Sequence, residues 1–491
     1  MNSADPQAFD VIVIGGGPAG ENVADRTAAA GLSTVIVESE LLGGECSYWA
    51  CDPSKALLRP VLLHSEVRDM PGLEQAAATP LNADAVLEHR NRMASNWDDG
   101  DQVDWLKQAN IALIRGHGRL TGRRAVTVSL PDGGSVDLRA RHAIVVSTGT
   151  RAALPPLPDL DALRPWTSRE ATSARRVPRR LAILGAGVVA TEMATAWQAL
   201  GAQVTLVARE EGLLPRVERF AADLVADRLR ESGVDLRFGT TITAAVRRGD
   251  PPGDIHITLS GGDEIVADEL LLATGRAPRT EDIGLETVGL QPGGWLKTDD
   301  TYAVIGVPGD WLYAIGDVNN RALLTHQGKY QGRIAGMVIS DRANRHPVDF
   351  GRWSRDVGTA DTVAVPQVVF TDPEVATVGL TTAEAARTGR KVDVVDYDIG
   401  QVGGAAQYSQ GYRGQARILI DPVRRTVLGA TFAGRGVAEL LHSATVVITG
   451  EVPLERLWHA VPPFPTISEV WLRLLETYSD ATREPADPRP K

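Results

Sequence analysis

Short apolar runs that end in glycine-rich turns recur along the chain. Residues 9–20 read FDVIVIGGGPAG, and residues 180–190 read RLAILGAGVVA. Each turn is followed by a helix-like stretch and, about 20 residues later, by a second apolar run at 34–37 or 204–207. The pattern predicts two separate strand–turn–helix–strand openings, each typical of a dinucleotide-binding unit.

Two later apolar segments close these openings, namely 143–149 (AIVVSTG) and 269–275 (ELLLATG). The proline-rich stretch 154–158 (LPPLP) predicts a linker between the two units, and a proline after the second closing strand predicts a return to the first. We therefore expect the first domain over 1–153, the second over 154–276, and the rest of the first over 277–360.

The C-terminal third has no glycine fingerprint and alternates strand-like runs with helices. Strands are expected at 367–370, 392–397, 416–420 and 427–432, with helices at 382–388 and 436–449. This pattern predicts a third, α+β domain over 361–480. Residues 481–491 are rich in proline and charge, so we expect a mobile tail there.

Composition and charge narrow the class of protein. The 491 residues are 43% hydrophobic and 23% charged, which is typical of a globular chain. The formal net charge of −11 argues against nucleic acid or an anionic membrane as partner. Because no apolar run is long enough to span a bilayer and the N-terminus is polar and acidic, we expect no membrane partner and no signal peptide. The presence of only two cysteines fits a reducing compartment, so we expect a cytoplasmic protein.

The first glycine turn has the residues that a dinucleotide needs. Gly15 permits the tight turn, Gly17 lets the backbone approach a pyrophosphate, and Gly20 lets the helix pack closely on the strand. Glu38 ends the second strand, where a carboxylate can accept hydrogen bonds from ribose hydroxyls. Gly149, at the end of the closing strand, is expected to line the same site.

The second glycine turn differs at the position that selects the nucleotide. Gly185 and Gly187 are followed by Ala190, and Gly275 ends the closing strand. Ala208 stands where an acid is expected, and Arg209 follows it. A guanidinium group pairs with a 2′-phosphate that a carboxylate would repel, so the sequence favours NADPH over NADH.

The only two cysteines, Cys46 and Cys51, lie five positions apart. They are spaced too widely for a zinc knuckle, and no further Cys or His set accompanies them, so no metal site is expected. A spacing of five at a helix end can bring two sulfurs within bonding range, and a helix N-terminus lowers the pKa of a thiol. The pair is then either a catalytic disulfide or two buried, inert thiols.

The order of these motifs resembles the class I pyridine nucleotide–disulfide oxidoreductases, the group of dihydrolipoamide dehydrogenase, glutathione reductase and mercuric reductase. The resemblance rests on the first glycine fingerprint, the segment 43–57 (GGECSYWACDPSKAL), the second fingerprint, the Gly-Asp of 313–318 (YAIGDV) and the segment 365–381 (VPQVVFTDPEVATVGLT). It covers nearly the whole chain. It implies an FAD domain, an NAD(P)H domain inserted in it, and a C-terminal domain that forms a homodimer.

The resemblance also implies roles for single residues. Cys51 would lie against the flavin of FAD and Cys46 would be the interchange thiol. Lys55 would lie near flavin N5, paired with Glu192, because a cation there stabilises reduced, anionic flavin. Asp317 would bind a cofactor hydroxyl.

The chain departs from the family near its C-terminus. Family members that reduce disulfides have a His-Pro-Thr-x-x-Glu segment, whose histidine acts as general acid/base and whose glutamate orients it. Here residues 462–469 read PPFPTISE, so Glu469 is present but Phe464 replaces the histidine. His459 is expected to be an ordinary residue of the preceding helix. No C-terminal cysteine pair of the mercuric reductase type is present.

Two further departures flank the thiols. Glu45 replaces a threonine and Asp52 an apolar residue, and we expect both carboxylates to disfavour thiolate and anionic acceptors.

We predict an FAD-dependent oxidoreductase that favours NADPH, has a redox-active Cys46–Cys51 disulfide and passes electrons to a disulfide, quinone or similar small-molecule acceptor. The electrons would pass through the Cys46–Cys51 disulfide or directly from the flavin. One alternative is a dihydrolipoamide dehydrogenase that uses His459 or water as the base. Another is a flavin-binding redox sensor with little turnover.

Overall fold

The computed structural model describes residues 5–249 and 253–482. Their contacts divide them into two compact units, one within 1–54, 89–153 and 275–362, and the other within 55–88, 154–274 and 363–482. Of the expected tail, Ala481 and Thr482 complete helix α15 (Val470–Thr482), and residues 483–491 lie outside the described residues.

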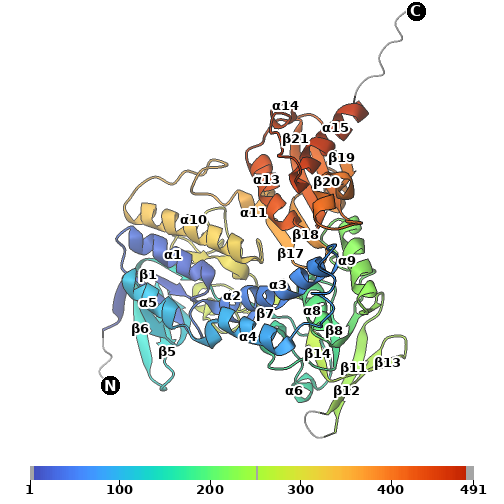
Figure 1. Ribbon diagram of the computed structural model, residues 1–491. Coiled ribbons are helices and arrows are strands. Elements are labelled where there is room, and N and C mark those ends of the chain that lie inside the picture. Colours follow the sequence, from blue (N-terminus) through green and yellow to red (C-terminus); the bar gives the residue numbers. More distant parts are fainter. Residues whose placement is uncertain (1–4, 250–252, 483–491) are drawn as a thin grey trace, which may run out of the picture. The chain divides into compact units, whose positions relative to one another are not determined.

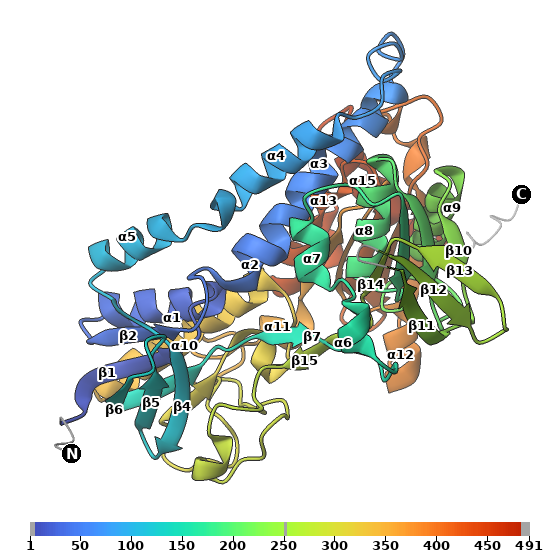
Figure 2. The same ribbon diagram turned by 90° about the horizontal axis from the view of Figure 1, so that it is seen from below.

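The first unit is built on a seven-stranded sheet whose main path runs β3-β2-β1-β6-β5-β4 (Figures 1 and 2). Its centre is parallel, since β1 pairs with β2 and β6 in the same direction and β16 pairs with β6. β1 ends in four buried apolar residues, which is why both faces of the sheet must be covered. The strands are β1 (Gln7–Ile14), β2 (Thr34–Glu38), β3 (Ala112–Arg115), β4 (His117–Gly122), β5 (Ala125–Ser129), β6 (Ser135–Val146) and β16 (Leu312–Ala314).

Two long helices of this unit, α1 (Pro18–Ala29) and α10 (Thr325–Ala343), pack against each other along much of their length (Figure 1). Glycines one turn apart on α10 make this possible. A Cβ on Gly332 would lie 2.6 Å from the carbonyl oxygen of Ala19, and one on Gly336 would lie 2.5 Å from Cβ of Arg26. The two backbones are therefore in near contact.

A two-stranded ribbon completes the first unit. β7 (Thr150–Ala152) pairs antiparallel with β15 (Arg276–Pro278). These strands are where the chain leaves for, and returns from, residues 154–274. The first unit also contains η1 (Ser95–Trp97), α5 (Gly100–Gln108), η2 (Leu285–Val288) and η3 (Gly316–Asn319), while α4 (Ala83–Met93) and α11 (Ala360–Val363) span the boundary between the two units.

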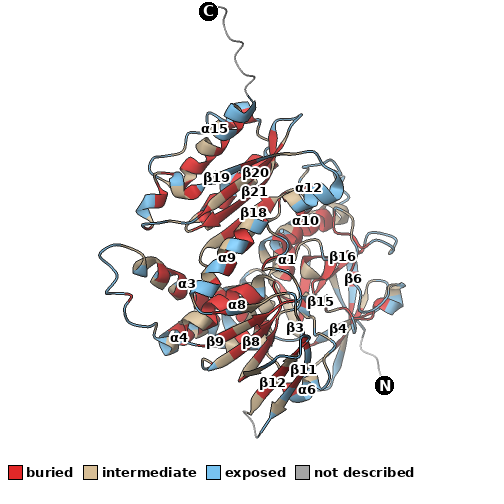
Figure 3. Ribbon diagram, turned by 90° about the vertical axis from the view of Figure 1, so that its right-hand side faces the viewer, coloured by how far each residue is buried: buried red, intermediate tan, exposed pale blue. Residues whose placement is uncertain are grey.

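The second unit contains a four-stranded parallel sheet in the order β10-β9-β8-β14. Figure 3 shows β8 and helix α8 as largely buried. The pattern follows from the sequence, because β8 and β14 are continuous apolar runs without polar alternation. The elements are β8 (Arg180–Leu184), α8 (Val188–Ala199), β9 (Gln203–Val207), α9 (Arg219–Glu231), β10 (Asp235–Arg237) and β14 (Glu269–Leu272).

A smaller antiparallel sheet, β11-β12-β13, joins this part of the second unit. Its central strand, β12, alternates half-buried and buried residues, as expected of a sheet with one face on the core. The elements are β11 (Ile242–Arg248), β12 (Asp254–Leu259) and β13 (Glu264–Ala267), preceded by α6 (Leu160–Leu163) and α7 (Ser168–Ser173).

The C-terminal part of the second unit is a five-stranded antiparallel sheet in the order β17-β18-β21-β20-β19, with α13 and α15 packed on it. The four predicted strands and both predicted helices are present within one or two residues at each end. β18 was missed, because its sequence EVATVG was read as part of a motif and not as a strand. The elements are β17 (Pro366–Val369), β18 (Glu374–Gly379), α12 (Thr382–Thr388), β19 (Asp393–Asp398), η4 (Ile399–Gln401), η5 (Ala405–Gln407), β20 (Gln415–Asp421), β21 (Thr426–Gly434), α13 (Val437–Thr449), α14 (Leu454–Leu457) and η6 (Ile467–Glu469).

A membrane-crossing helix would have to be both long and strongly apolar, and the described residues form none.

Candidate active site

The first glycine turn forms an open cradle at the N-terminus of α1. Gly15 has φ 103°, and a Cβ there would clash with the carbonyl oxygen of Ser147. A Cβ on Gly20 would clash with the carbonyl oxygen of Gly15, whereas the nearest atom to one on Gly17 would be 3.9 Å away. The backbone at Gly17 is thus open to a phosphate, at a helix end without a side-chain cap.

Glu38 is fixed beside this cradle. Its Oε2 accepts the N–H of Gly16 and its Oε1 accepts the N–H of Glu40, both at 2.7 Å. Two buried oxygen atoms, Oγ1 of Thr148 and Oε1 of Glu21, have no hydrogen-bond partner in the described structure. Open glycine backbone, a helix N-terminus and an anchored carboxylate fit the adenosine and pyrophosphate parts of FAD.

Asp317 lies at the start of η3, behind the end of β16. Oγ1 of Thr150 donates to its Oδ2 at 2.7 Å, and burial raises the pKa of the carboxyl group. Gly149 precedes this threonine with φ 67° and open space where a Cβ would stand. The three residues leave room for a cofactor hydroxyl against a polar, buried carboxyl group.

The second glycine turn repeats the plan in the second unit. A Cβ on Gly185 would clash with the carbonyl oxygen of Ala273, and a Cβ on Gly187 would meet no atom within 4 Å. Ala190 occupies the packing position and is fully buried. Gly275, at the end of the ATG segment, has φ 139°, which favours glycine. The opening at the N-terminus of α8 fits a second pyrophosphate.

The two residues after β9 differ in exposure. Ala208 is buried, but the side chain of Arg209 is 84% exposed, and its Nε donates to Oε1 of Glu210 at 3.0 Å. An exposed pair of this kind is weakly held, so the guanidinium group is available to a phosphate.

The two cysteines lie at the junction of two helices in the first unit. Cys46 is in α2 (Gly44–Trp49) and Cys51 begins α3 (Cys51–Arg68). The structure holds both as thiols. Oγ1 of Thr325, the first residue of α10, donates to Sγ of Cys46 at 3.1 Å and lies 3.2 Å from Sγ of Cys51.

The pKa of Cys46 differs from the sequence-based expectation. A hydrogen bond with Cys51 and burial raise the pKa of this thiol, and Asp52 adds to the effect. The expected lowering at a helix N-terminus does not prevail, because the neighbouring thiol and the low dielectric both disfavour the thiolate in the dithiol state. Thr325 opposes the shift by hydrogen bonding to the sulfur.

Lys55 follows Cys51 by one turn on α3 and belongs, like its partners, to the second unit. Nζ lies 2.9 Å from Oε2 and 3.1 Å from Oε1 of Glu192, whose side chain is only 4% exposed. The N–H of Phe370 donates to Oε1 of the same glutamate at 3.0 Å, and Nζ lies 5.0 Å from the centre of the Phe370 ring. The ammonium group is therefore held by a buried counter-charge and an aromatic face.

The negative charge that Glu45 adds beside the thiols is paired in the fold. Its carboxylate pairs with the guanidinium groups of Arg276 and Arg279. Sequence reasoning missed these arginines and Thr325, because none lies in a fingerprint; the succession ATGRAPR after the closing strand was the available signal.

The C-terminal segment has an aromatic ring where the family has an imidazole. Phe464 is 78% exposed. A Cβ on Gly403 would lie 2.6 Å from Cε2 of Phe464 and 3.4 Å from Oε2 of Glu469, so the ring and the carboxylate flank the same glycine. His459 lies just beyond α14 and is exposed.

Glu469 itself is engaged elsewhere. Its Oε2 accepts the N–H of Gly403 at 3.0 Å, and its Oε1 accepts Nη2 of Arg473 at 2.6 Å. The glutamate is 6% exposed. The carboxylate that would orient a histidine is here paired with an arginine one turn along α15.

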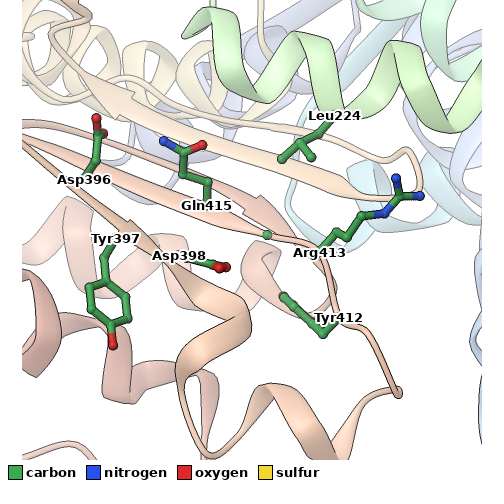
Figure 4. Close-up of a pocket in the computed structure, with 8 residues that line it drawn as sticks. Leu224, Asp396, Tyr397, Asp398, Tyr412, Arg413 and Gln415 are labelled. Carbon is green, nitrogen blue, oxygen red and sulfur yellow. The ribbon is translucent and has the colours of Figure 1, made fainter.

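A separate cavity of about 450 Å³ lies in the second unit, between α9 and the edge of the C-terminal sheet (Figure 4). Leu224 faces the loop of Tyr412 and Arg413 there. The charged groups of this cavity are already compensated, since Arg413 pairs with Glu231 at 2.7 Å and Asp396 with Arg417 at 2.7 Å. We assign it no ligand.

The fold and the site define an oxidoreductase with two dinucleotide cradles and a close pair of thiols. Residues 9–332 match the family model of pyridine nucleotide-disulphide oxidoreductases, and residues 365–474 match the dimerisation domain of that family. The chain belongs to this family of flavoproteins. Its C-terminal sheet is the family's dimerisation domain, which supports a homodimer.

Known proteins are similar in sequence to this chain over nearly its full length. A dihydrolipoyl dehydrogenase of Rhizobium etli is 30% identical over 482 residues, covering 94% of this chain and 96% of that protein. Dihydrolipoyl dehydrogenase 3 of Pseudomonas aeruginosa is 32% identical over 472 residues, with coverages of 94% and 96%. FAD and a pyridine nucleotide are the cofactors expected of this family.

Solved structures share the fold. LpdA from Mycobacterium tuberculosis aligns with a TM-score of 0.81 at 22% identity, covering 96% of this chain and 99% of that one. A Cu(II) complex of the HOCl-induced flavoprotein disulfide reductase RclA from Escherichia coli aligns with a TM-score of 0.80 at 23% identity, with the same coverages.

Proposed function

We propose that this protein is an FAD-dependent NAD(P)H oxidoreductase that favours NADPH and reduces a small acceptor other than a disulfide. The observation that carries the proposal is the C-terminal segment, where Phe464 replaces the proton-transferring imidazole and Arg473 occupies the carboxylate of Glu469. The two changes belong together, because a carboxylate without an imidazole needs another partner when buried.

The preference for NADPH rests on the second cradle. Gly187 leaves the helix N-terminus open to the pyrophosphate, and Arg209 can pair with a 2′-phosphate. The acid that would hold the 2′-hydroxyl of NADH is replaced by Ala208.

FAD, when bound, would take a hydride from NADPH and pass two electrons to the protein's disulfide. Lys55 would supply positive charge, and Glu192 and Phe370 would hold its ammonium group in place. Cleavage of the Cys46–Cys51 bond takes up two electrons and two protons and gives the dithiol. Thr325 would hydrogen bond to whichever sulfur is charged during that change.

The class of acceptor is inferred from the lack of a proton-transferring side chain at position 464. A general base is typically worth about 10²–10⁴-fold in rate, and reduction of an external disulfide needs one to activate the interchange thiol. A quinone or a metal ion such as Cu(II) accepts electrons without that proton transfer. An exposed phenyl ring also offers a flat quinone a stacking surface.

An acceptor panel tests the proposal with both nucleotides. The acceptors are lipoamide, glutathione and mycothiol disulfides, naphthoquinones, and cupric and mercuric ions. We expect turnover with NADPH and naphthoquinone or Cu(II) to exceed that with any disulfide, and Cys46→Ser to show whether the thiols lie on the electron path. Faster turnover with lipoamide and NADH, or with dihydrolipoamide and NAD⁺, would instead establish a dihydrolipoamide dehydrogenase, the activity named for the relatives at 30–32% identity. Absence of flavin bleaching by either nucleotide under anaerobic conditions would indicate a sensor with little turnover.

A further inference from the structure

Glu45 and two arginines form a cluster in the first unit. Glu45 is the second residue of α2 and directly precedes Cys46. Nη2 of Arg276 lies 2.5 Å from Oε2 of this glutamate, and Nη2 of Arg279 lies 2.9 Å from Oε1. Each carboxylate oxygen therefore has its own guanidinium group. The three side chains are 18%, 23% and 37% exposed, so the pairing is shielded more than a surface ion pair.

The arginines are in turn anchored to the β7–β15 ribbon. Nε of Arg276 donates to Oγ1 of Thr150 at 2.8 Å, and Nε of Arg279 donates to the carbonyl oxygen of Thr150 at 3.1 Å. The threonine hydroxyl continues to Asp317, as described above. The cluster thus links the turn of Cys46 to the ribbon and to the carboxyl group expected to bind the flavin cofactor.

The local backbone explains why such a link is useful. Gly43 and Gly44 both have positive φ, and α2 is six residues long without a side-chain cap. A short helix that follows two glycines has little conformational restraint of its own. The pairing with Arg276 and Arg279 supplies the restraint.

The charges of the cluster also bear on the thiol. Cys46 meets Cys51 and Asp52 from α3 and Thr325 from α10. Arg276 and Arg279 come from the ribbon, and Glu45 offsets one of their two positive charges at direct contact. Without it, the two guanidinium groups would lose this counter-charge beside Cys46, and positive charge favours a thiolate.

We propose that Glu45 is a positioning residue: by bridging Arg276 and Arg279, it fixes the turn that carries Cys46 and keeps the guanidinium charge from acting on the thiol. The inference rests on the proposed function, in which Cys46 is the interchange thiol. It assigns a role to Glu45, which replaces the threonine that other family members have before the first cysteine.

The pH dependence of Cys46 alkylation tests it. The reduced holoenzyme is treated with iodoacetamide from pH 6 to 10, and tandem mass spectrometry locates the label on Cys46 or Cys51. Glu45→Gln keeps the shape and removes the charge, so we expect the pKa of Cys46 to fall by about one unit and its labelling near neutral pH to rise about tenfold. Arg279→Gln should have the opposite sign and slow labelling about threefold. The double variant should return to within about twofold of the parent, because it restores the balance of charge.

An unchanged Cys46 profile in Glu45→Gln would overturn the proposal, as would a double variant shifted as far as Glu45→Gln alone. If Glu45→Gln does not fold, the sign of the shift in Arg279→Gln decides. Glu264→Gln, an exposed glutamate on β13, is the matched control. Alkylation needs neither nucleotide nor acceptor. A protein that turns over no acceptor would therefore contradict the proposed function, but the alkylation profile of Cys46 would still test the role of Glu45.

Discussion

The ammonium nitrogen of Lys55 lies 2.9 Å from Oε2 of Glu192, and the other oxygen of that carboxylate accepts the backbone N–H of Phe370 at 3.0 Å. One buried glutamate therefore fixes both a charge and a chain segment. The charge of Glu192 can be removed by substitution with glutamine, which keeps an oxygen as hydrogen-bond acceptor.

The variant Glu192→Gln keeps an oxygen for Phe370 and removes the counter-charge of Lys55. We expect the rate of flavin reduction by NADPH to fall about 10–100-fold, because the ammonium group is no longer held where reduced flavin needs it. Anaerobic stopped-flow bleaching measures this rate. Glu264→Gln is the control, and an unchanged rate at full flavin content would contradict the role of the pair.

Arg209 should determine the nucleotide preference. We expect Arg209→Gln to lower kcat/KM for NADPH about tenfold or more and to leave the value for NADH nearly unchanged, because only the phosphorylated ribose uses the guanidinium group. Arg179 is 83% exposed and paired with Asp268, so Arg179→Gln is a matched control. Equal losses with both nucleotides would mean that Arg209 does not contact the 2′-phosphate. Steady-state kinetics at fixed ionic strength decides.

Phe464 and Glu469 flank Gly403, so a histidine at 464 lies within reach of the carboxylate. We expect Phe464→His to raise turnover with lipoamide or glutathione disulfide by about tenfold. The gain should be larger in Phe464→His combined with Arg473→Met, because Glu469 is then released to orient the imidazole. No gain in either variant, with folding and flavin content intact, would refute the missing-base argument.

Glu21 should make the stability of the apoprotein depend on pH. Burial raises the pKa of its carboxyl group from 4.5 to about 7, with Lys329 opposing and Glu38 adding to the shift. The folded state therefore binds the proton more tightly, so stability falls as pH rises from 4.5 to about 7 and stays lower above that. We expect Glu21→Gln to stabilise the apoprotein by about 2 kcal/mol at pH 8 and hardly at all at pH 4.5. Urea unfolding at the two pH values measures this; equal effects at both would contradict it.

The glycines of α10 should not tolerate a methyl group. Alanine normally stabilises a helix by about 1 kcal/mol relative to glycine. At Gly332 we expect the reverse, a loss of about 1–3 kcal/mol, because the added Cβ would lie 2.6 Å from the carbonyl oxygen of Ala19. Gly261→Ala, where a Cβ would meet no atom, is the control. Thermal unfolding of both variants gives the comparison.

The sequence predicted what depends on local pattern. The two cradles followed from Gly15 and Gly185 because a strand, a turn with positive φ and a helix are encoded within about 30 residues. The family resemblance supplied the Lys55–Glu192 pair, whose members are 137 positions apart.

The other features of the candidate site depend on contacts between distant parts of the chain, which no local sequence pattern encodes. Glu45 looked like an added negative charge, and only the fold brings two arginines from 231 and 234 positions away to neutralise it. Cys46 at a helix end suggested a lowered pKa, but the adjacent Cys51 and burial outweigh that effect.

The glycines along α10 have a consequence for the dimensions of the first unit. α1 presents its N-terminus to the phosphate cradle, and α10 presents Thr325 to the sulfurs. Because the two helices meet backbone to backbone, their spacing does not depend on the rotamers of large side chains. The distance between the place for the phosphates and the place for the thiols is then set by main-chain geometry, so substitution of the surrounding large side chains should leave it unchanged.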